Sequence, residues 1–136
     1  MTSRSHIEQS LRSLYAARVR GDLNETLKDI ADDAVFSLNG RGTGHPAMSE
    51  ASSGKAAIRS TIQQLINDWR FEDWKECSLL VDGDKAVLHW KARVTCIPTK
   101  KSDNFDVVDV ITFRDGKIIE FRQTTDTALV MALASA

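Results

Sequence analysis

The chain has 136 residues, about the length of one domain, and a domain of this size buries roughly 68–70% of its unfolded surface without disulfides or metals. It carries 18 Lys and Arg residues against 19 Asp and Glu residues, so no broad basic surface is available for nucleic acid. No apolar run approaches the ~18 residues of a membrane span, and the N-terminus lacks the pattern of a secretory signal. We therefore expect a cytoplasmic protein with neither nucleic acid nor a membrane as partner.

Two helices are predicted at the start of the chain. Ser5 and Glu8 form a capping-box pattern for the first helix, and Gly21 suits a left-handed end. Asp22 then caps a second, shorter helix, with Glu25 three residues further on. Together they predict an αα-hairpin. The apolar residues at helical spacing are Ile7, Leu11, Leu14, Tyr15 and Val19 in the first helix, and Leu23, Leu27, Ile30 and Ala31 in the second.

A short strand and a glycine-rich loop come next. The apolar run 35–38 predicts the strand, and the loop after it extends to about Ser53. We interpret this loop as the rim of a pocket. From Ser53 onward a third helix is predicted, because apolar side chains recur at helical spacing at Ile58, Ile62, Leu65, Ile66 and Trp69.

After the third helix the pattern changes to that of strands, interrupted by two turns of the kind that close hairpins. Three helices followed by paired strands indicate an α+β fold, an antiparallel sheet on segregated helices, in one domain spanning 1–136. The predicted hairpins pair about 71–81 with 85–97 across Asp82-Gly83-Asp84, and about 105–114 with 117–126 across Asp115-Gly116.

Short segments along the chain carry a resemblance to a known group of proteins. They are Gly21-Asp22-Leu23, Ala31-Asp32-Asp33-Ala34-Val35, Gly54-Lys55-Ala56-Ala57-Ile58, and Gly116-Lys117-Ile118-Ile119 leading to Asp126-Thr127-Ala128-Leu129-Val130. In this order and spacing they resemble the nuclear transport factor 2-like superfamily, in particular its SnoaL-like and ketosteroid isomerase-like branches. The resemblance implies a cone-shaped fold, with the helices on a strongly curved sheet around a deep apolar pocket. It also implies a homodimer through the outer face of the sheet.

The superfamily includes isomerases, polyketide cyclases, epoxide hydrolases, dehydratases and proteins without catalysis, so activity has to be argued from the site. Asp109 is the first candidate. Strand alternation places it on one face with Val107, Ile111 and Phe113, where desolvation would raise the pKa of its carboxyl and let it donate a hydrogen bond to an enolate oxygen. Its segment also resembles the strand that carries the oxyanion-stabilising Asp of ketosteroid isomerases. The alternative is a strand acid paired with an Arg or a backbone group.

Asp126 and Arg93 are the other catalytic candidates. Asp126 ends the last predicted strand, where the resemblance to SnoaL-like cyclases and limonene-type epoxide hydrolases implies an acid–base carboxylate; the alternative is an N-cap for a helical turn from Thr127 to Leu133. Arg93 corresponds to an Arg that the epoxide-hydrolase branch places between two carboxylates, although it could equally face solvent. Thr95 stands at the second of these carboxylates, which makes epoxide hydrolysis by that pair doubtful.

The ketosteroid isomerase pattern is only partly present. The proton-shuttling Asp of that family corresponds to Leu38, with Asn39 beside it. Its oxyanion-stabilising Tyr corresponds to Leu14, although Tyr15 could take the role with a shift of one residue. The familiar steroid isomerase route therefore lacks its base, unless Asp126 supplies it.

We expect a pocket for a small apolar molecule that carries a carbonyl group, with acid–base isomerase, cyclase or hydrolase activity, no metal and no organic cofactor. Asp126 would act as acid or base, and Asp109 or Arg93 would stabilise charge. The competing hypothesis is a ligand-binding or dimerisation module without catalysis, because Leu38 and Thr95 replace carboxylates. The residues predicted to bind substrate are Tyr15, Leu14, Phe36, Leu38, Asn39, Trp69 and His89, the last of which could instead be an ordinary half-exposed strand residue.

Overall fold

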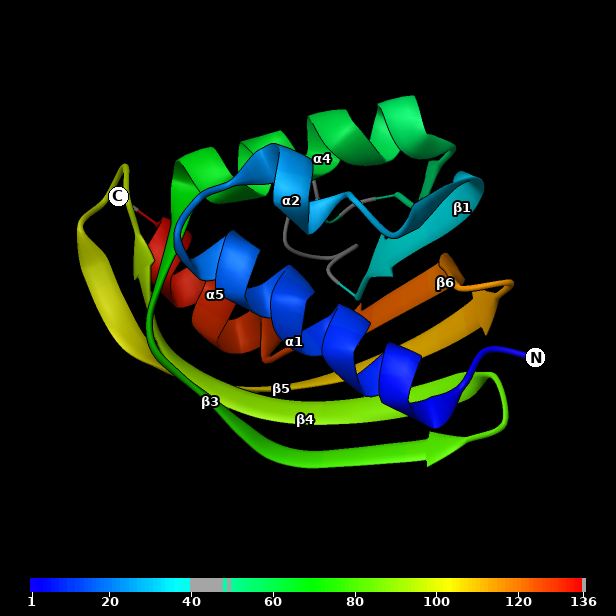
Figure 1. The fold of residues 1–136 in the computed structure, drawn as a ribbon. Coiled ribbons are helices and arrows are strands. Elements are labelled where there is room, and N and C mark those ends of the chain that lie inside the picture. The colour runs from blue at the N-terminus through cyan, green and yellow to red at the C-terminus, as the bar shows by residue number, and fades with distance from the viewer. Residues whose placement is uncertain (40–47, 49, 136) are drawn as a thin grey trace.

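The computed structural model describes residues 1–39, 48 and 50–135. A six-stranded sheet curves around α1, and the α4 helix lies across the open side of the curve (Figure 1). This is the α+β architecture predicted from the sequence, with the helices packed on one face of the sheet. None of the helices in the described ranges is long and apolar enough to span a membrane.

The first helix, α1 (Arg4–Val19), has its cap two residues earlier than predicted, at Ser3. Ser3 has an extended backbone, and its side chain accepts a hydrogen bond from the backbone N–H of His6 at 3.2 Å. The prediction of Ser5 as the cap was wrong, because Ser5 already lies inside the helix. Gly21, just after the helix, adopts a φ of 76°, the left-handed conformation predicted for it.

Three further helices are described in full along the chain. In α2 (Leu23–Thr26), Asp22 accepts a hydrogen bond from the backbone N–H of Glu25 at 3.1 Å, which confirms the predicted cap. The predicted third helix is α4 (Lys55–Asp68). The last helix, α5 (Thr127–Ala134), follows the final strand, where the sequence suggested a helical turn from Thr127 to Leu133.

The strands form one sheet in the order β2-β1-β6-β5-β4-β3. Both predicted hairpins are confirmed, as β3 with β4 and β5 with β6. Strand β1 lies parallel to β6, a pairing between the first third of the chain and its last strand. The strands are β1 (Ile30–Leu38), β2 (Ser52–Ser53), β3 (Trp69–Asp82), β4 (Lys85–Cys96), β5 (Lys101–Arg114) and β6 (Lys117–Thr124).

The hydrophobic core lies between the concave face of the sheet and the helices. Strand β5 illustrates how the sequence directs its side chains there, because Phe105, Val107, Asp109, Ile111 and Phe113 alternate with more exposed residues and are all buried. An ionisable residue, Asp109, therefore occupies the middle of the otherwise apolar buried row of β5.

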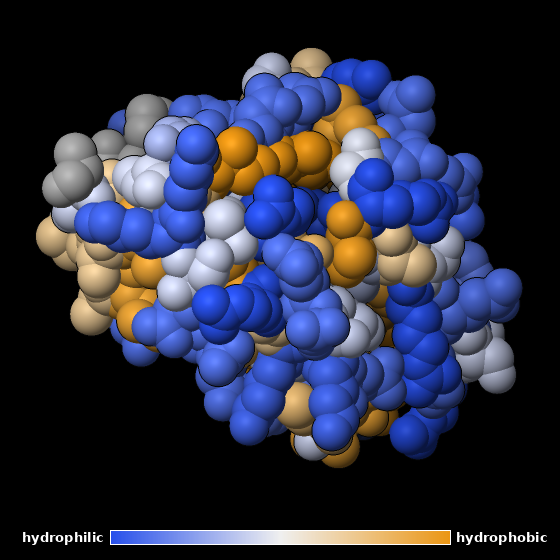
Figure 2. All heavy atoms as spheres, turned by 90° about the vertical axis from the view of Figure 1, so that its left-hand side faces the viewer, coloured by the Kyte–Doolittle hydropathy of each residue, from blue (hydrophilic) through white to orange (hydrophobic). Residues whose placement is uncertain are grey.

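Seen from one end, the surface is mostly hydrophilic, with apolar side chains visible in patches (Figure 2).

Candidate functional site

A cavity opens between the concave face of the sheet and the helices. The space between its walls is about 810 Å³ when its open mouth and the adjoining solvent are included, and the room for the centres of water-sized molecules is about 80 Å³. Helices α1, α2 and α4 and strands β1, β3, β4, β5 and β6 all contribute side chains to its wall. Most of these side chains are apolar or aromatic; the polar ones are Tyr15, Arg18, Thr26, Gln123 and Thr125.

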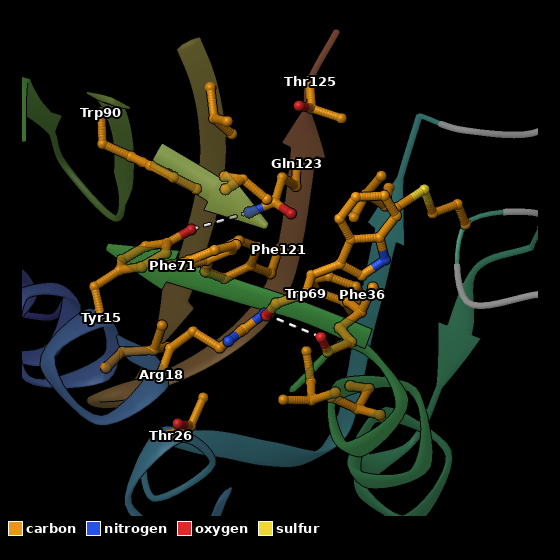
Figure 3. A pocket seen from close by; sticks show the side chains of 18 of the residues that line it. Tyr15, Arg18, Thr26, Phe36, Trp69, Phe71, Trp90, Phe121, Gln123 and Thr125 are labelled. Atoms are coloured by element: carbon orange, nitrogen blue, oxygen red, sulfur yellow. Dashed lines mark hydrogen bonds between the residues drawn. The ribbon is translucent and has the colours of Figure 1, made fainter. Parts of the chain in front are cut away.

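A buried hydrogen-bond network centred on Asp109 lies at one end of the cavity. Asp109 is 0% exposed and sits behind Tyr15, Trp90 and Gln123, which line the wall. The Tyr15 hydroxyl donates to Asp109 Oδ2, and Trp90 Nε1 donates to the same oxygen at 2.9 Å. Gln123 Nε2 donates to Asp109 Oδ1 at 3.1 Å. It also donates to Tyr15 Oη at 3.0 Å (Figure 3). The carboxyl group itself does not line the cavity, but its hydrogen-bond partners Tyr15 and Gln123 do.

Burial is the largest influence on the pKa values of Asp109 and Tyr15, and it raises both. Desolvation raises the pKa of Asp109 to about 7, although the hydrogen bonds from Tyr15, Trp90 and Gln123 act in the opposite direction by favouring the ionised form. Burial, together with the neighbouring Asp109 carboxyl, raises the pKa of Tyr15 well above its usual value. Near neutral pH, Asp109 is therefore divided between its protonated and ionised forms, while Tyr15 keeps its proton.

Aromatic side chains hold Tyr15 in place. Its ring stacks on Trp74, with centroids 5.0 Å apart and planes inclined by 18°, and lies 5.1 Å from the ring of Trp90. Trp74 Nε1 is buried and has no hydrogen-bond partner among the described residues. These contacts fix the direction of the Tyr15 hydroxyl towards Asp109 and Gln123.

Arg18 lies one turn after Tyr15 on the same face of α1, at another part of the cavity wall (Figure 3). Its side chain is buried, and Nη2 donates to the carbonyl oxygens of Leu65 at 3.2 Å and Trp69 at 2.8 Å. The guanidinium carbon lies 4.0 Å from the centre of the Phe71 ring. Burial lowers the pKa of Arg18 to about 10, so the side chain is still a cation at neutral pH.

Five of the residues predicted to bind substrate do line the cavity. Of the two candidates Leu14 and Tyr15, it is Tyr15 whose hydroxyl donates a hydrogen bond to Asp109. Aromatic and aliphatic walls surround it. The predicted lining residues found there are Leu14, Tyr15, Phe36, Leu38 and Trp69.

Two predicted catalytic residues lie elsewhere. Asp126 is exposed and caps α5, accepting a hydrogen bond from the backbone N–H of Leu129 at 3.1 Å, which is the capping alternative. Arg93 is exposed and alternates along β4 with the buried Ala92 and Val94, which is the solvent-facing alternative. Neither residue is among those that line the cavity. The structure therefore does not bring Asp126 and Arg93 together with the buried Asp109 in one site.

Asn39 and His89 also lie off the cavity wall. The Asn39 side chain accepts a hydrogen bond from the Thr125 backbone N–H at 2.8 Å, so it ties the end of β1 to the end of β6. His89 is half-exposed on the outer face of β4, where it contacts Asp106. Of the glycine-rich loop that was interpreted as a pocket rim, residues 40–47 and 49 lie outside the described residues.

The sequence interpretation missed Gln123, Arg18 and the polar role of Trp90. A signal for Arg18 was available, since it follows Leu14 and Tyr15 at the spacing of one helix face. Gln123 shares a strand face with the buried Phe121, two residues earlier. Both were passed over because long polar side chains are usually exposed.

Other parts of the molecule bear on metals and partners. Among the described residues, no three His, Cys, Asp or Glu side chains are grouped so that they could hold a metal ion. The outer face of the sheet carries partly exposed apolar side chains, Leu80 on β3, Val87 on β4 and Val108 on β5. The homodimer through this face stays a prediction.

Comparison with known proteins establishes the family. The sequence profile of the SnoaL-like domain matches residues 11–121, well over half of the chain. The chain belongs to the SnoaL-like domain family. The matched range of this SnoaL-like domain includes Tyr15, Arg18 and Asp109, and it ends two residues before Gln123. The search of curated proteins gave no match.

Solved structures share the fold of this SnoaL-like domain. An NTF2-like protein of unknown function from Burkholderia pseudomallei is 22% identical with a TM-score of 0.83, covering 100% of both chains. A protein provisionally named a SnoaL-like polyketide cyclase, from Jannaschia sp. CCS1, is 18% identical with a TM-score of 0.81, covering 100% of this chain and 97% of the other. An LEH-like epoxide hydrolase from M. tuberculosis is 17% identical with a TM-score of 0.71, covering 91% and 85%. The nuclear transport factor 2-like superfamily suggested by the sequence is thus confirmed, and neighbours with several activities share its fold.

Proposed function

We propose that this SnoaL-like domain binds a small, largely apolar molecule through a carbonyl or enol oxygen, and that it catalyses keto–enol proton transfer of the isomerase or cyclase type. The observation that carries the proposal is the Asp109 network. The fully buried carboxyl group of Asp109 is hydrogen-bonded to Tyr15 and Gln123, and these two polar side chains line the wall of a largely apolar cavity. Such polar groups in an apolar pocket orient a ligand and respond to charge that develops on it.

Hydrogen-bond accounting shows how the network would respond to a ligand oxygen. With Asp109 ionised, the Tyr15 hydroxyl donates to the carboxylate and has no hydrogen left for a ligand. With Asp109 protonated on Oδ2, the carboxyl group donates to Tyr15 Oη, and the Tyr15 hydrogen becomes free to point into the cavity. A ligand oxygen that accepts this hydrogen therefore favours the protonated form of Asp109.

The same arrangement would stabilise an enolate. As the proton passes from a carbon of the substrate to water or to a basic group of the substrate itself, negative charge grows on the carbonyl oxygen, and a hydrogen bond from Tyr15 strengthens in proportion. Asp109 supports this bond by donating to Tyr15 Oη, and Gln123 Nε2 donates to the same oxygen. Because Asp109 has a pKa of about 7, the protonated form is available at neutral pH. Epoxide hydrolysis has no comparable support, since Arg93 and Asp126 are exposed.

A second candidate function is binding without conversion, and one observation favours it. The described residues that line the cavity include no carboxylate, imidazole, amine or thiol that could take a proton from carbon. Leu38, at the position predicted from the family to carry the base, is buried and lines the wall. If the substrate or the Asp109–Tyr15 pair cannot supply the base, the cavity would hold its ligand unchanged.

Hydrogen–deuterium exchange on an enolisable ketone separates the two functions. 2-Tetralone would be incubated in D2O with and without the protein, and loss of its α-proton signals followed by NMR, with binding measured by calorimetry. Catalysis predicts exchange faster than in buffer, reduced about 100-fold by Tyr15→Phe, because one donor to the developing charge is lost. Arg93→Met, on the outer face, is the matched control. Binding with exchange at the buffer rate would contradict the enzymatic proposal and favour the second candidate.

A further inference from the structure

Arg18 is a buried cation in the wall of the cavity, and the proposed chemistry does not use it. Only 7% of the residue is exposed, and it comes from the same face of α1 as Tyr15. The guanidinium carbon lies over the Phe71 ring, and Nη2 donates to the carbonyl oxygens of Leu65 and Trp69. These contacts fix the position of the charge in the cavity wall.

Three of the five N–H donors of Arg18 remain unused. The two bonds from Nη2 account for two donors, and neither Nε nor Nη1 has a hydrogen-bond partner among the described residues. Neither atom is sealed inside the protein, because the one fully buried polar side-chain atom without a partner in the described ranges is Trp74 Nε1. Arg18 is also one of the residues that line the cavity.

The charge of Arg18 is also uncompensated. Within the described part of the chain, no carboxylate lies within 4.0 Å of its nitrogens, whereas the ion pairs of Arg4, Arg12 and Arg114 are at the surface. A buried cation without a counter-ion is costly, and its cost falls when an anion binds beside it. Carbonyl oxygens and an aromatic face offset only part of that cost.

We infer that Arg18 binds a carboxylate of the ligand, which makes the preferred ligands keto acids: apolar molecules with a carbonyl oxygen at Tyr15 and Gln123 and a carboxylate at Arg18. This inference rests on the proposed function for the carbonyl end and adds the charged end. A neutral ketone would leave the Arg18 donors unsatisfied, and a ligand with two separated polar groups would be held in one orientation. Arg18 is then the residue that distinguishes acids from neutral molecules of the same shape.

The competing interpretation is that Arg18 only ties α1 to the junction of α4 and β3, through the carbonyl oxygens of Leu65 and Trp69. A structural role predicts no preference for acids. The two can be separated by comparing each acid with its own methyl ester, because the pair differs in charge while the ketone stays the same.

The probes are 3-benzoylpropanoate, 4-benzoylbutanoate and 5-benzoylpentanoate, each with its methyl ester, and calorimetry gives their dissociation constants. We expect at least one acid to bind about tenfold more tightly than its ester, since hydrogen bonds to a charged partner are among the stronger ones. Arg18→Met is expected to reduce that ratio to about one. Arg93→Met, which removes an exposed charge from the outer face, is expected to leave the ratio as it is.

If Arg18→Met does not fold, the Nε–Hε resonance of Arg18 in the unaltered protein carries the test, because the acid should shift it and the ester should not. Equal affinities for acid and ester, no binding of any of the three acids, or a ratio that Arg18→Met leaves intact would overturn the inference. Tyr15→Phe separates this inference from the proposed function. It should weaken acid and ester equally; if it weakens neither while the ratio persists, Arg18 keeps its role and the carbonyl site is refuted.

Discussion

Replacing Asp109 with Asn should remove a pH dependence from the stability of the protein. In the folded chain the pKa of Asp109 is about 7, whereas an unfolded Asp has a pKa of about 3.9. Between these values the folded state holds a proton that the unfolded state has released. The stability that Asp109 contributes is therefore fully present below pH 4 and is lost as the pH rises to 7. The expected loss is about 1.4 kcal/mol per pH unit, on the order of 4 kcal/mol in total.

The measurement is the free energy of unfolding in urea at pH 5, 6, 7 and 8, for the unaltered protein and for Asp109→Asn. Tryptophan fluorescence can follow unfolding, because Trp90 lies next to the carboxyl group. The stability difference between the two proteins cancels most other titrations, and it should fall from pH 5 to pH 7 and then level off.

Asp106→Asn is the matched control on the same strand. Its carboxylate is exposed, and the hydrogen bond with His89 lowers its pKa, so its contribution has the opposite sign and is lost only as the pH falls into the acid range. A stability difference for Asp109→Asn that stays constant from pH 5 to pH 8 would show that Asp109 is ionised in the folded protein throughout. Asp109 could then not donate a hydrogen bond to Tyr15 Oη, and the proposed role of Tyr15 as a donor to the ligand oxygen would be refuted.

Two more variants test neighbouring parts of this structure. Trp90→Phe removes one donor to the ionised carboxylate, so the pKa of Asp109 should rise by about one further unit, measured by 13C NMR titration of the carboxyl carbon; an unchanged or lower pKa would contradict the network described above. Asp126→Ala should cost about 1 kcal/mol of stability through loss of the α5 cap, measured by urea unfolding, while exchange of 2-tetralone continues at its former rate. A loss of exchange with intact folding would instead restore the acid–base role predicted for Asp126 from the sequence.

Local patterns were sufficient to predict most of the fold. The helical spacing of α1 and α4, the Asp22 cap and the two glycine turns each depend on a few consecutive residues, and each is present in the structure. The same spacing was wrong for Ile30 and Ala31, which lie in β1, and for Trp69, which begins β3. The parallel pairing of β1 with β6 could not be found this way. It joins Val35 to Glu120, and no local signal records a partner so distant in the sequence. The two-residue strand β2 is equally hidden, because two serines in a loop carry no alternation.

The site shows the same division between local and distant information. Alternation along β5 identified Asp109 as buried, but its partners come from α1, β4 and β6 and could not be read from that strand. Asp126 was ambiguous for a physical reason, since a carboxylate at the end of a strand can face a pocket or cap the helix that follows. The choice depends on the direction of the chain after the strand, which tertiary packing decides.

The pairing of β1 with β6 also governs when this protein can fold. The contact between Tyr15 and Asp109 spans 94 residues, and β1 obtains its central partner only when the last strand has been made. During synthesis from the N-terminus, the apolar faces of α1 and β1 therefore stay exposed to solvent until β6 is made, and exposed apolar surface promotes aggregation and chaperone binding. Contacts this distant in sequence also slow the search for the native state. We expect the cavity and the sheet to be completed in the same late step, so a chain truncated before β6 would have neither.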